Sequence, residues 1–351
     1  MRRGIFPKDR LGELIRRWAA DRQIVAPVRQ GAVEFETVES VAGICLDYRN
    51  TRLPAKRLFF PPSEALLRFD FKAAPERQVA EAPSDTHPTV LFGVRPCEAR
   101  SLTLLDCVFL GNDYRDPYYA RRREATALVV LACSTTAPTC FCTSVGGSPT
   151  DRAGADLLLT DVGDVFLVEV VSDRGEALLA GFSLPGADIE TIERAERAGA
   201  QLAASMPLVV GLDRIGSLDV HVFDDPCWQT IAERCLACAA CSFLCPTCHC
   251  FDIQDEVIAQ QGRRVRNYDA CMFAQFTLHA SGHNPRTYKS QRVRQRLLHK
   301  FAYFPDNFGA VACVGCGRCI RACPAGNDIR QWLSALAAAC RDQSGAGCQP
   351  A

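Results

Sequence analysis

The chain has 351 residues, with 40 Lys and Arg against 40 Asp and Glu, so its formal net charge is zero. A balanced charge gives no reason to expect a nucleic acid or an anionic membrane as a partner. No run of about 18 apolar residues is present, so neither a transmembrane helix nor membrane insertion is predicted. Twenty cysteines follow an N-terminus that lacks the apolar run of a signal peptide. We therefore expect a cytoplasmic protein whose thiolates bind metal rather than form disulfide bonds.

The first part of the chain predicts short elements. Residues 8–20 carry apolar side chains at helical spacing and predict an amphipathic helix. Residues 24–28 and 33–35 predict two short strands joined by a turn that contains glycine. We expect residues 63–67 to begin a helical turn. The Pro-rich, polar residues 73–88 are expected to form a surface loop.

A parallel α/β unit is predicted next. Residues 90–94 (VLFGV) and 127–132 (ALVVLA) have the composition of buried strands, and a helix is expected between them through about Leu110. Strand, helix and strand in this order are typical of a parallel sheet. In such sheets, functional sites gather beyond the carboxyl ends of the strands.

The middle of the chain predicts further regular elements. Two strands are expected within residues 157–171, a surface helix at residues 187–205, and a helix around Trp228. The fold class is α+β. An N-terminal α/β domain (residues 1–222) is followed by a helical, ferredoxin-like domain with a long insert (residues 223–342) and a tail (residues 343–351).

Two copies of one cysteine pattern dominate the C-terminal part. Residues 235–246 read CLACAACSFLCP and residues 313–324 read CVGCGRCIRACP. Both are C-x2-C-x2-C-x3-C-P, the pattern with which bacterial ferredoxins bind 4Fe–4S clusters. The alternative is a pair of zinc sites, but zinc sites usually use two separated C-x2-C pairs. Two 4Fe–4S clusters are therefore predicted.

The ligands of the two clusters follow from the spacing. In two-cluster ferredoxins the fourth cysteine of each run ligates the cluster of the other run. The sequence therefore predicts one cluster on Cys235, Cys238, Cys241 and Cys323. It predicts the other cluster on Cys313, Cys316, Cys319 and Cys245.

Four further cysteines fall near the carboxyl ends of the two predicted parallel strands. Cys97 follows the first strand, Cys133 follows the second, and Cys140 and Cys142 lie on the adjoining loop. They are candidates for a third cluster. The alternative is that they are thiols without metal, since free cysteine is commonly buried.

The two runs are separated by a long insert, residues 246–312. It carries Cys248, Cys250 and Cys271, which either support a further metal site or pack beside the clusters. Asn284-Pro285 predicts a helix start. Residues 262–300 contain nine Lys and Arg against one acid, Asp269. This basic run indicates either a solvated helix face or a docking surface for an acidic partner.

Several stretches resemble the iron–sulfur beta subunit of sulfhydrogenases, which are cytoplasmic hydrogenase/sulfur reductases. The A subunit of anaerobic sulfite reductase is similar. The Arg-Pro-Cys and Cys-Phe-Cys segments are more specific to this family than the ferredoxin runs. One departure is His249, where an aromatic or aliphatic residue is expected. The stretches are residues 59–64 (FFPPSE), 93–98 (GVRPCE), 108–110 (VFL), 139–142 (TCFC), 245–248 (CPTC) and 313–319 (CVGCGRC).

The resemblance implies a non-catalytic subunit that moves electrons. Its implied partners are a flavoprotein subunit that binds NAD(P) and a catalytic subunit, either a nickel–iron hydrogenase or a sirohaem reductase. The chain itself has no G-x-G-x-x-G after a strand and no phosphate-binding G-x-x-x-x-G-K-[ST] loop. The flavin is therefore expected on another chain. Two alternatives remain open: an enzyme whose active site lies in the N-terminal domain, and a redox-sensing iron–sulfur protein.

Overall fold

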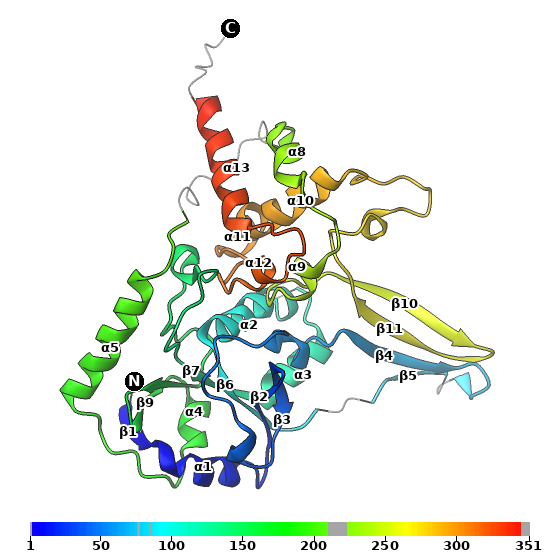
Figure 1. Cartoon of the computed structure of the whole chain (residues 1–351). Coiled ribbons are helices and arrows are strands. Elements are labelled where there is room, and N and C mark those ends of the chain that lie inside the picture. Colours follow the sequence, from blue (N-terminus) through cyan, green and yellow to red (C-terminus); the bar gives the residue numbers. More distant parts are fainter. Residues whose placement is uncertain (1, 76–77, 84–85, 112, 210–222, 345–351) are drawn as a thin grey trace. The chain divides into compact units, whose positions relative to one another are not determined.

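The computed structural model describes residues 2–75, 78–83, 86–111, 113–209 and 223–344 (Figure 1). The chain folds into two compact units, each discontinuous in sequence. The first unit comprises Met1–Phe60, Asp85–Leu208 and Val314–Gly317, and the second comprises Pro61–Ser84, Val209–Cys313 and Arg318–Ala351. The predicted domain boundary near residue 222 lies outside the described residues. None of the described helices is long and apolar enough to span a membrane.

A seven-stranded mixed sheet forms the first unit (Figure 1). The strands β2, β6, β7 and β8 run parallel, while β1, β3 and β9 pair antiparallel with their neighbours. The predicted parallel strand–helix–strand unit is thereby confirmed as β6, α2 and β7. In sheet order the strands are β1 (Arg3–Pro7), β9 (Val165–Val170), β8 (Leu157–Asp161), β7 (Thr126–Leu131), β6 (Thr89–Val94), β2 (Gln23–Gln30) and β3 (Ala32–Thr37).

The three helices that the sequence predicts for the first unit are present in the structure. The predicted amphipathic helix is α1, the helix between the parallel strands is α2, and the predicted surface helix is α5. The bounds are α1 (Leu11–Trp18), α2 (Pro96–Phe109), α3 (Pro117–Ala125), α4 (Asp173–Leu178) and α5 (Ile189–Ala204). Short 3-10 turns lie at Lys8–Arg10, Val41–Gly43, Ala55–Leu58 and Cys142–Val145.

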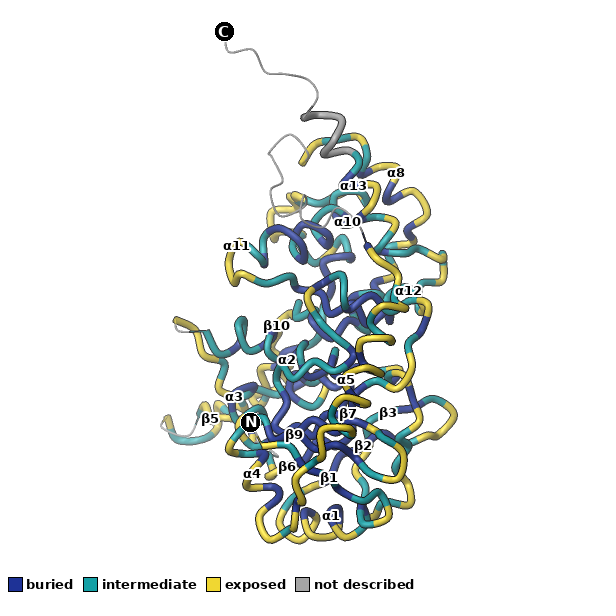
Figure 2. Tube along the Cα trace, turned by 90° about the vertical axis from the view of Figure 1, so that its left-hand side faces the viewer, coloured by how far each residue is buried: buried dark blue, intermediate teal, exposed yellow. Residues whose placement is uncertain are grey.

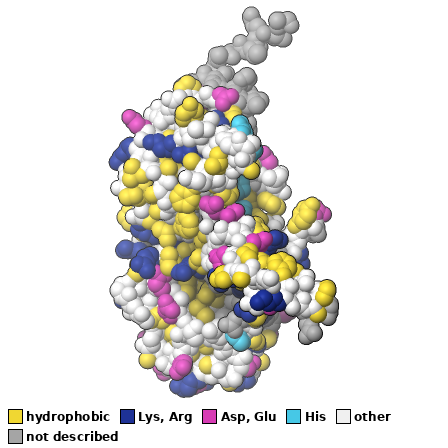
Figure 3. Space-filling model, turned by 90° about the vertical axis from the view of Figure 1, so that its right-hand side faces the viewer, with side chains coloured by type: hydrophobic (Ala, Val, Ile, Leu, Met, Phe, Trp, Pro, Cys, Tyr) yellow, Lys and Arg dark blue, Asp and Glu magenta, His cyan; other side chains and the backbone are white. Residues whose placement is uncertain are grey.

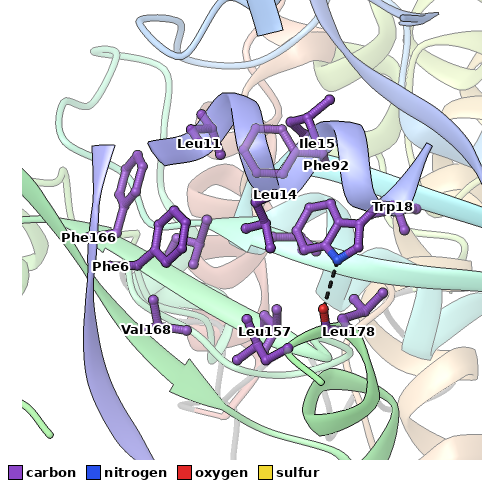
Figure 4. Close-up of a cluster of buried hydrophobic side chains, with 14 of the residues drawn as sticks. Phe6, Leu11, Leu14, Ile15, Trp18, Phe92, Leu157, Phe166, Val168 and Leu178 are labelled. Atoms are coloured by element: carbon purple, nitrogen blue, oxygen red, sulfur yellow. Dashed lines mark hydrogen bonds between the residues drawn. The ribbon is translucent and has the colours of Figure 1, made fainter. Parts of the chain in front are cut away.

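The core of the first unit lies between α1, α4 and one face of the sheet (Figure 4). Trp18 of α1 is buried there, and its indole Nε1 donates a hydrogen bond to the carbonyl of Leu178 at 2.8 Å. Val90 and Phe92 of β6 point into this core, yet Leu91 between them is equally buried. Both faces of the central strands are therefore covered, as parallel sheets require. Figure 2 accordingly shows these strands as mostly buried.

The second unit holds a four-stranded antiparallel sheet and several short helices (Figure 1). In sheet order the strands are β10 (Phe251–Ile258), β11 (Gln261–Tyr268), β4 (Ser63–Asp70) and β5 (Val79–Glu81). The helices are α8 (Cys227–Ala232), α9 (Ala240–Phe243), α10 (Lys289–Leu298), a π-helical turn (His299–Tyr303), α11 (Phe304–Phe308), α12 (Arg318–Arg321) and α13 (Ile329–Ser344). A further 3-10 turn lies at Gln275–Thr277.

Residues 63–67 are not helical, so that prediction is wrong. They begin strand β4, which pairs with β11 nearly 200 residues later in the chain. Glu64 of β4 accepts a hydrogen bond from Arg266 of β11 at 2.6 Å, and both side chains are buried. The expected loop at residues 73–88 also contains a strand, β5, which pairs with β4.

The helix predicted from Asn284-Pro285 begins later, at Lys289. Asn284 stabilises a turn instead, because its side-chain oxygen accepts from the backbone N–H of Arg286 at 3.0 Å. The backbone N–H of Tyr288 donates to the side chain of Gln291 at 2.9 Å, which caps α10. The N-cap position of α10, Tyr288, thus lies four residues later than the sequence pattern indicates.

The basic run of the insert is mostly paired or buried. Arg263 and Arg264 lie on β11 and form ion pairs with acids of β10, and Arg266 pairs with Glu64. Three more basic residues, Arg292, Arg296 and Lys300, are buried. Of these six residues, Arg263 and Arg264 are exposed on a strand, whereas Arg292, Arg296 and Lys300 do not belong to a solvated helix face. On the face drawn in Figure 3, basic, acidic and hydrophobic side chains are mixed.

Candidate iron–sulfur sites

One pocket of the second unit is lined by cysteines from both runs. The first run contributes Cys235, Cys238 and Cys241, and the second contributes Cys323 and Cys319. The first three thiols and Cys323 are the set predicted for one cluster. An all-sulfur donor set is the one that iron–sulfur clusters use.

The rest of this pocket is largely apolar. Met272, Ile329 and Trp332 are among the residues that line it, and Arg296 is the one Lys, Arg, Asp or Glu among the described lining residues. Burial raises the pKa of the Cys235 thiol, so metal has to displace its proton. Backbone N–H groups also point at the sulfurs, for example Asn327 N at 3.3 Å from the Cys323 sulfur. Hydrogen bonds of this kind influence the potential of a cluster.

The two runs repeat one backbone conformation. Ala237 and Ala239 in the first run have φ of 53° and 61°. The corresponding residues of the second run are Gly315 and Gly317, with φ of 62° and 71°. Such angles suit glycine, whereas an alanine there costs about 1–2 kcal/mol. Strain that persists in a loop marks a site where the surrounding structure imposes the conformation.

The glycines of the second run also permit a close approach within the first unit. A Cβ atom on Gly315 would lie 2.4 Å from the backbone nitrogen of Cys142. A Cβ atom on Gly317 would lie 2.4 Å from the carbonyl oxygen of Thr139. The backbone N–H of Phe141 donates to the Gly315 carbonyl at 2.9 Å. The segment that carries Cys316 therefore lies directly against the Cys-Phe-Cys loop.

The structure brings together three of the four cysteines predicted for a third cluster. The pKa of Cys133 is raised to about 11 and that of Cys142 to about 12, mainly by burial, and the neighbouring thiol of Cys140 contributes to both shifts. The backbone N–H of Ala137 donates to the Cys140 sulfur at 3.4 Å. Cys97 lies in the first turn of α2 and is half-buried.

Arg95 is a structural residue of this site that the sequence analysis did not identify. Its guanidinium is buried and donates to the carbonyls of Ala132 at 2.8 Å and Leu46 at 3.0 Å. It also stacks on the ring of Tyr48, 4.3 Å from the ring centroid. Arg95 thus joins the ends of β6 and β7, and its charge opposes the effect of burial on the pKa of Cys133. The Arg-Pro-Cys motif could have indicated this role.

Two buried cations lie beside the cysteines of the second unit. Lys300 Nζ is 3.4 Å from the Cys245 sulfur and donates to Thr247 Oγ1 and the Ala312 carbonyl, each at 2.9 Å. Burial alone lowers the pKa of Lys300, but the thiols of Cys245 and Cys248 raise it above its usual value. The charged form is therefore favoured.

Arg296 contacts the same group of cysteines from one helical turn earlier. Its guanidinium donates to the Cys241 carbonyl at 2.8 Å, to Ser242 Oγ at 3.0 Å and to the Cys248 sulfur at 3.3 Å. The nearby thiols raise its pKa although burial lowers it. In the sequence, Arg296 and Lys300 are two of the nine basic residues at 262–300, and nothing distinguishes them from the other seven.

The three cysteines of the insert take part in two thiol pairs, one of them with Cys245 of the first run. Cys248 donates to Cys245 and thereby holds the pKa of Cys245 well below its usual value. Cys271 donates to Cys250 and lowers the pKa of Cys250 to about 6. His249 Nδ1 lies 3.0 Å from the Thr247 carbonyl oxygen, and its ring meets that of His299 edge to face at 5.4 Å.

Among the described residues, no group of three or more His, Cys, Asp or Glu side chains is arranged to hold one metal ion. The thiolates of a 4Fe–4S cluster each bind a different iron, so they stand further apart than the ligands of a single ion. The set of Cys235, Cys238, Cys241 and Cys323 in the pocket fits such a cluster.

The repeated cysteine runs and the cysteine-lined pocket are those of an iron–sulfur protein. Residues 234–327 match the family model of the 4Fe-4S dicluster domain, which supports 4Fe–4S clusters as the cofactors. The chain is 34% identical over 312 residues to the sulfhydrogenase 2 subunit beta of Pyrococcus furiosus, covering 86% of this chain and 89% of that protein. The chain belongs to the sulfhydrogenase beta-subunit family. The predicted resemblance is thereby confirmed, as is the α+β class with a C-terminal dicluster domain.

Proposed function

We propose that this chain is the electron-transfer subunit of a cytoplasmic hydrogenase/sulfur reductase. It relays single electrons through 4Fe–4S clusters between a flavin- and NAD(P)-binding subunit and a catalytic subunit. The observation that carries the proposal is the pocket lined by Cys235, Cys238, Cys241 and Cys323. The membership of the sulfhydrogenase beta-subunit family supports the relay role.

In this proposal two ligand sets hold the two clusters. Cys235, Cys238, Cys241 and Cys323 hold the first, and Cys313, Cys316, Cys319 and Cys245 hold the second. When bound, each cluster accepts and releases one electron at a time. The protein contributes thiolates, N–H groups directed at sulfur and an apolar surround, which together set the potential.

The need for a flavoprotein partner follows from the chemistry of the carriers. A nicotinamide exchanges a hydride, that is two electrons, whereas an iron–sulfur cluster exchanges one. A flavin can mediate between the two. Because the sequence lacks a dinucleotide-binding glycine motif, the proposal places the flavin on another subunit.

A third cluster on Cys97, Cys133, Cys140 and Cys142 is the part of the proposal that an iron count tests directly. We expect the double variant Cys140→Ala/Cys142→Ala to contain about four fewer irons per chain than the parent protein, about eight instead of about twelve. The matched control is Cys107→Ala, which removes a half-buried thiol whose sulfur donates to the Thr103 carbonyl at 3.3 Å. Unchanged iron in the double variant would show that these four thiols hold no cluster.

The relay itself is tested by anaerobic purification from the native host under mild conditions. We expect the chain to co-purify with a flavoprotein and a nickel–iron subunit, with about eight or about twelve irons per chain. A sirohaem subunit in place of the nickel–iron subunit would identify an anaerobic sulfite reductase. A chain recovered alone with full clusters would contradict the relay. The isolated chain would then be assayed for turnover and for redox-dependent partner binding.

A further inference from the structure

We propose that Arg296 and Lys300 are positioning residues that set the reduction potential of the clusters, with the cysteine thiolates and the cluster charge as their counter-ions. The two residues lie on α10 and on the π-helical turn that follows it. The inference rests on the proposed ligand sets and adds a role for side chains that ligate no iron.

Both side chains are buried, and neither has an acidic partner among the described residues. Arg296 is 2% exposed and Lys300 is 3% exposed. In the part of the chain that the structure describes, all their hydrogen-bond acceptors are sulfur, hydroxyl or carbonyl groups. Arg266 gives the contrast, because it is equally buried but pairs with the carboxylate of Glu64.

Burying a cation without a counter-ion is unfavourable in free energy. Moving a charge out of water costs several kcal/mol even after relaxation, so buried charges in proteins are paired or coordinate a metal. Two such cations lie within four positions on one continuous helical segment of this chain. Thiolates and the clusters that they bind are the anions available beside them.

The placement of the two cations fits this role. Arg296 reaches the backbone and side chains around Cys241 and Cys248. Lys300 reaches Cys245 and the carbonyl of Ala312, the residue before Cys313. The pair therefore contacts the first run and the residue that precedes the second. A four-residue separation on a helix directs both side chains to one face.

The electrostatic consequence has a definite sign. Reduction adds one negative charge to a cluster, and a fixed positive charge nearby stabilises that reduced form. In a buried, weakly screened environment the interaction is much stronger than in water. Removing either positive charge must therefore lower the potential and make the cluster harder to reduce.

The test is a potentiometric titration of the iron–sulfur signals in the purified full-length holoprotein, followed by electron paramagnetic resonance. The neutral variants are Arg296→Gln and Lys300→Met, and the charge-preserving variants are Arg296→Lys and Lys300→Arg. We expect each neutral variant to lower the ratio of reduced to oxidised cluster at least tenfold at a fixed ambient potential, a shift of about 59 mV for one electron. The charge-preserving variants are expected to recover most of this ratio.

Arg263→Gln is the matched control. It removes one positive charge from the same unit, but from an exposed arginine that pairs with Glu256. Its reduced-to-oxidised ratio is expected to equal that of the parent protein. If the buried cations were only structural, the variants would change iron content or stability, but the potential would not fall in the neutral variants and recover in the charge-preserving ones.

A further variant leaves both cations in place. Ser242→Asp places a carboxylate where Ser242 Oγ now accepts from Arg296 at 3.0 Å, and it should lower the potential in the same direction. If the neutral variants fail to assemble clusters, the midpoint potential of Ser242→Asp tests the proposal instead. Unchanged midpoints in variants that retain their iron would overturn this proposal and leave the relay proposal intact. A parent protein that holds no iron would instead overturn the relay.

Discussion

Cys323→Ala is expected to remove the same iron–sulfur cluster as Cys238→Ala, although the two residues belong to different cysteine runs. Both thiols line one pocket of the second unit. Each single variant should lose about four irons per chain. The double variant should lose no more than either single variant, because a cluster that is already absent cannot be lost again.

The control pairs Cys323 with a cysteine that is assigned to the other cluster. Cys319→Ala/Cys323→Ala is expected to lose about eight irons, since its two thiols serve different clusters in the proposed assignment. Iron analysis and the electron paramagnetic resonance signals of the reduced protein distinguish the outcomes. The opposite pattern, with about eight lost in the Cys238 pair and about four in the Cys319 pair, would show that each run holds its own cluster.

Removing the iron is expected to unfold the second unit while the first unit keeps its sheet. In small metal-binding domains the free energy of metal binding is largely folding free energy. The interior of the second unit holds buried thiols together with Arg296 and Lys300, whose positive charges would lose their counter-ions. The first unit is stabilised by an apolar core around Trp18 and Phe92, which contains no metal ligand.

Amide hydrogen exchange before and after anaerobic chelation measures this difference. We expect the amides of α10 to exchange roughly a hundredfold faster or more in the iron-free protein, equivalent to about 2.8 kcal/mol of lost local stability. The amides of β6 and β7 serve as the internal reference and should keep their protection. Equal loss of protection in β6 and α10 would show that the two units unfold together, and unchanged protection in α10 would show that iron does not stabilise it.

Local sequence patterns identified much of the fold. The helical spacing of apolar residues predicted α1, and two short apolar runs predicted β6 and β7. The cysteine spacing predicted the class of cofactor, because the pattern C-x2-C-x2-C-x3-C-P is complete within 12 consecutive residues. These features depend on neighbours in the sequence, so the sequence alone contains them.

Long-range pairing was not predictable in the same way. Residues 63–67 were expected to begin a helical turn, but they belong to β4 because β11 offers them a partner strand about 200 residues away. The buried pair of Arg266 and Glu64 supports that register. β-strand preference depends strongly on such tertiary context, which no local window contains.

By itself the sequence determined that this is an iron–sulfur protein of the sulfhydrogenase beta-subunit family, with eight ferredoxin cysteines in two runs. The spacing also predicted that Cys323 joins Cys238, and only the tertiary structure decided that Arg296 and Lys300 lie buried beside the thiols. The physical reason is that spacing along the chain specifies which ligands are available. Burial and charge compensation, by contrast, depend on which segments the folded chain brings together.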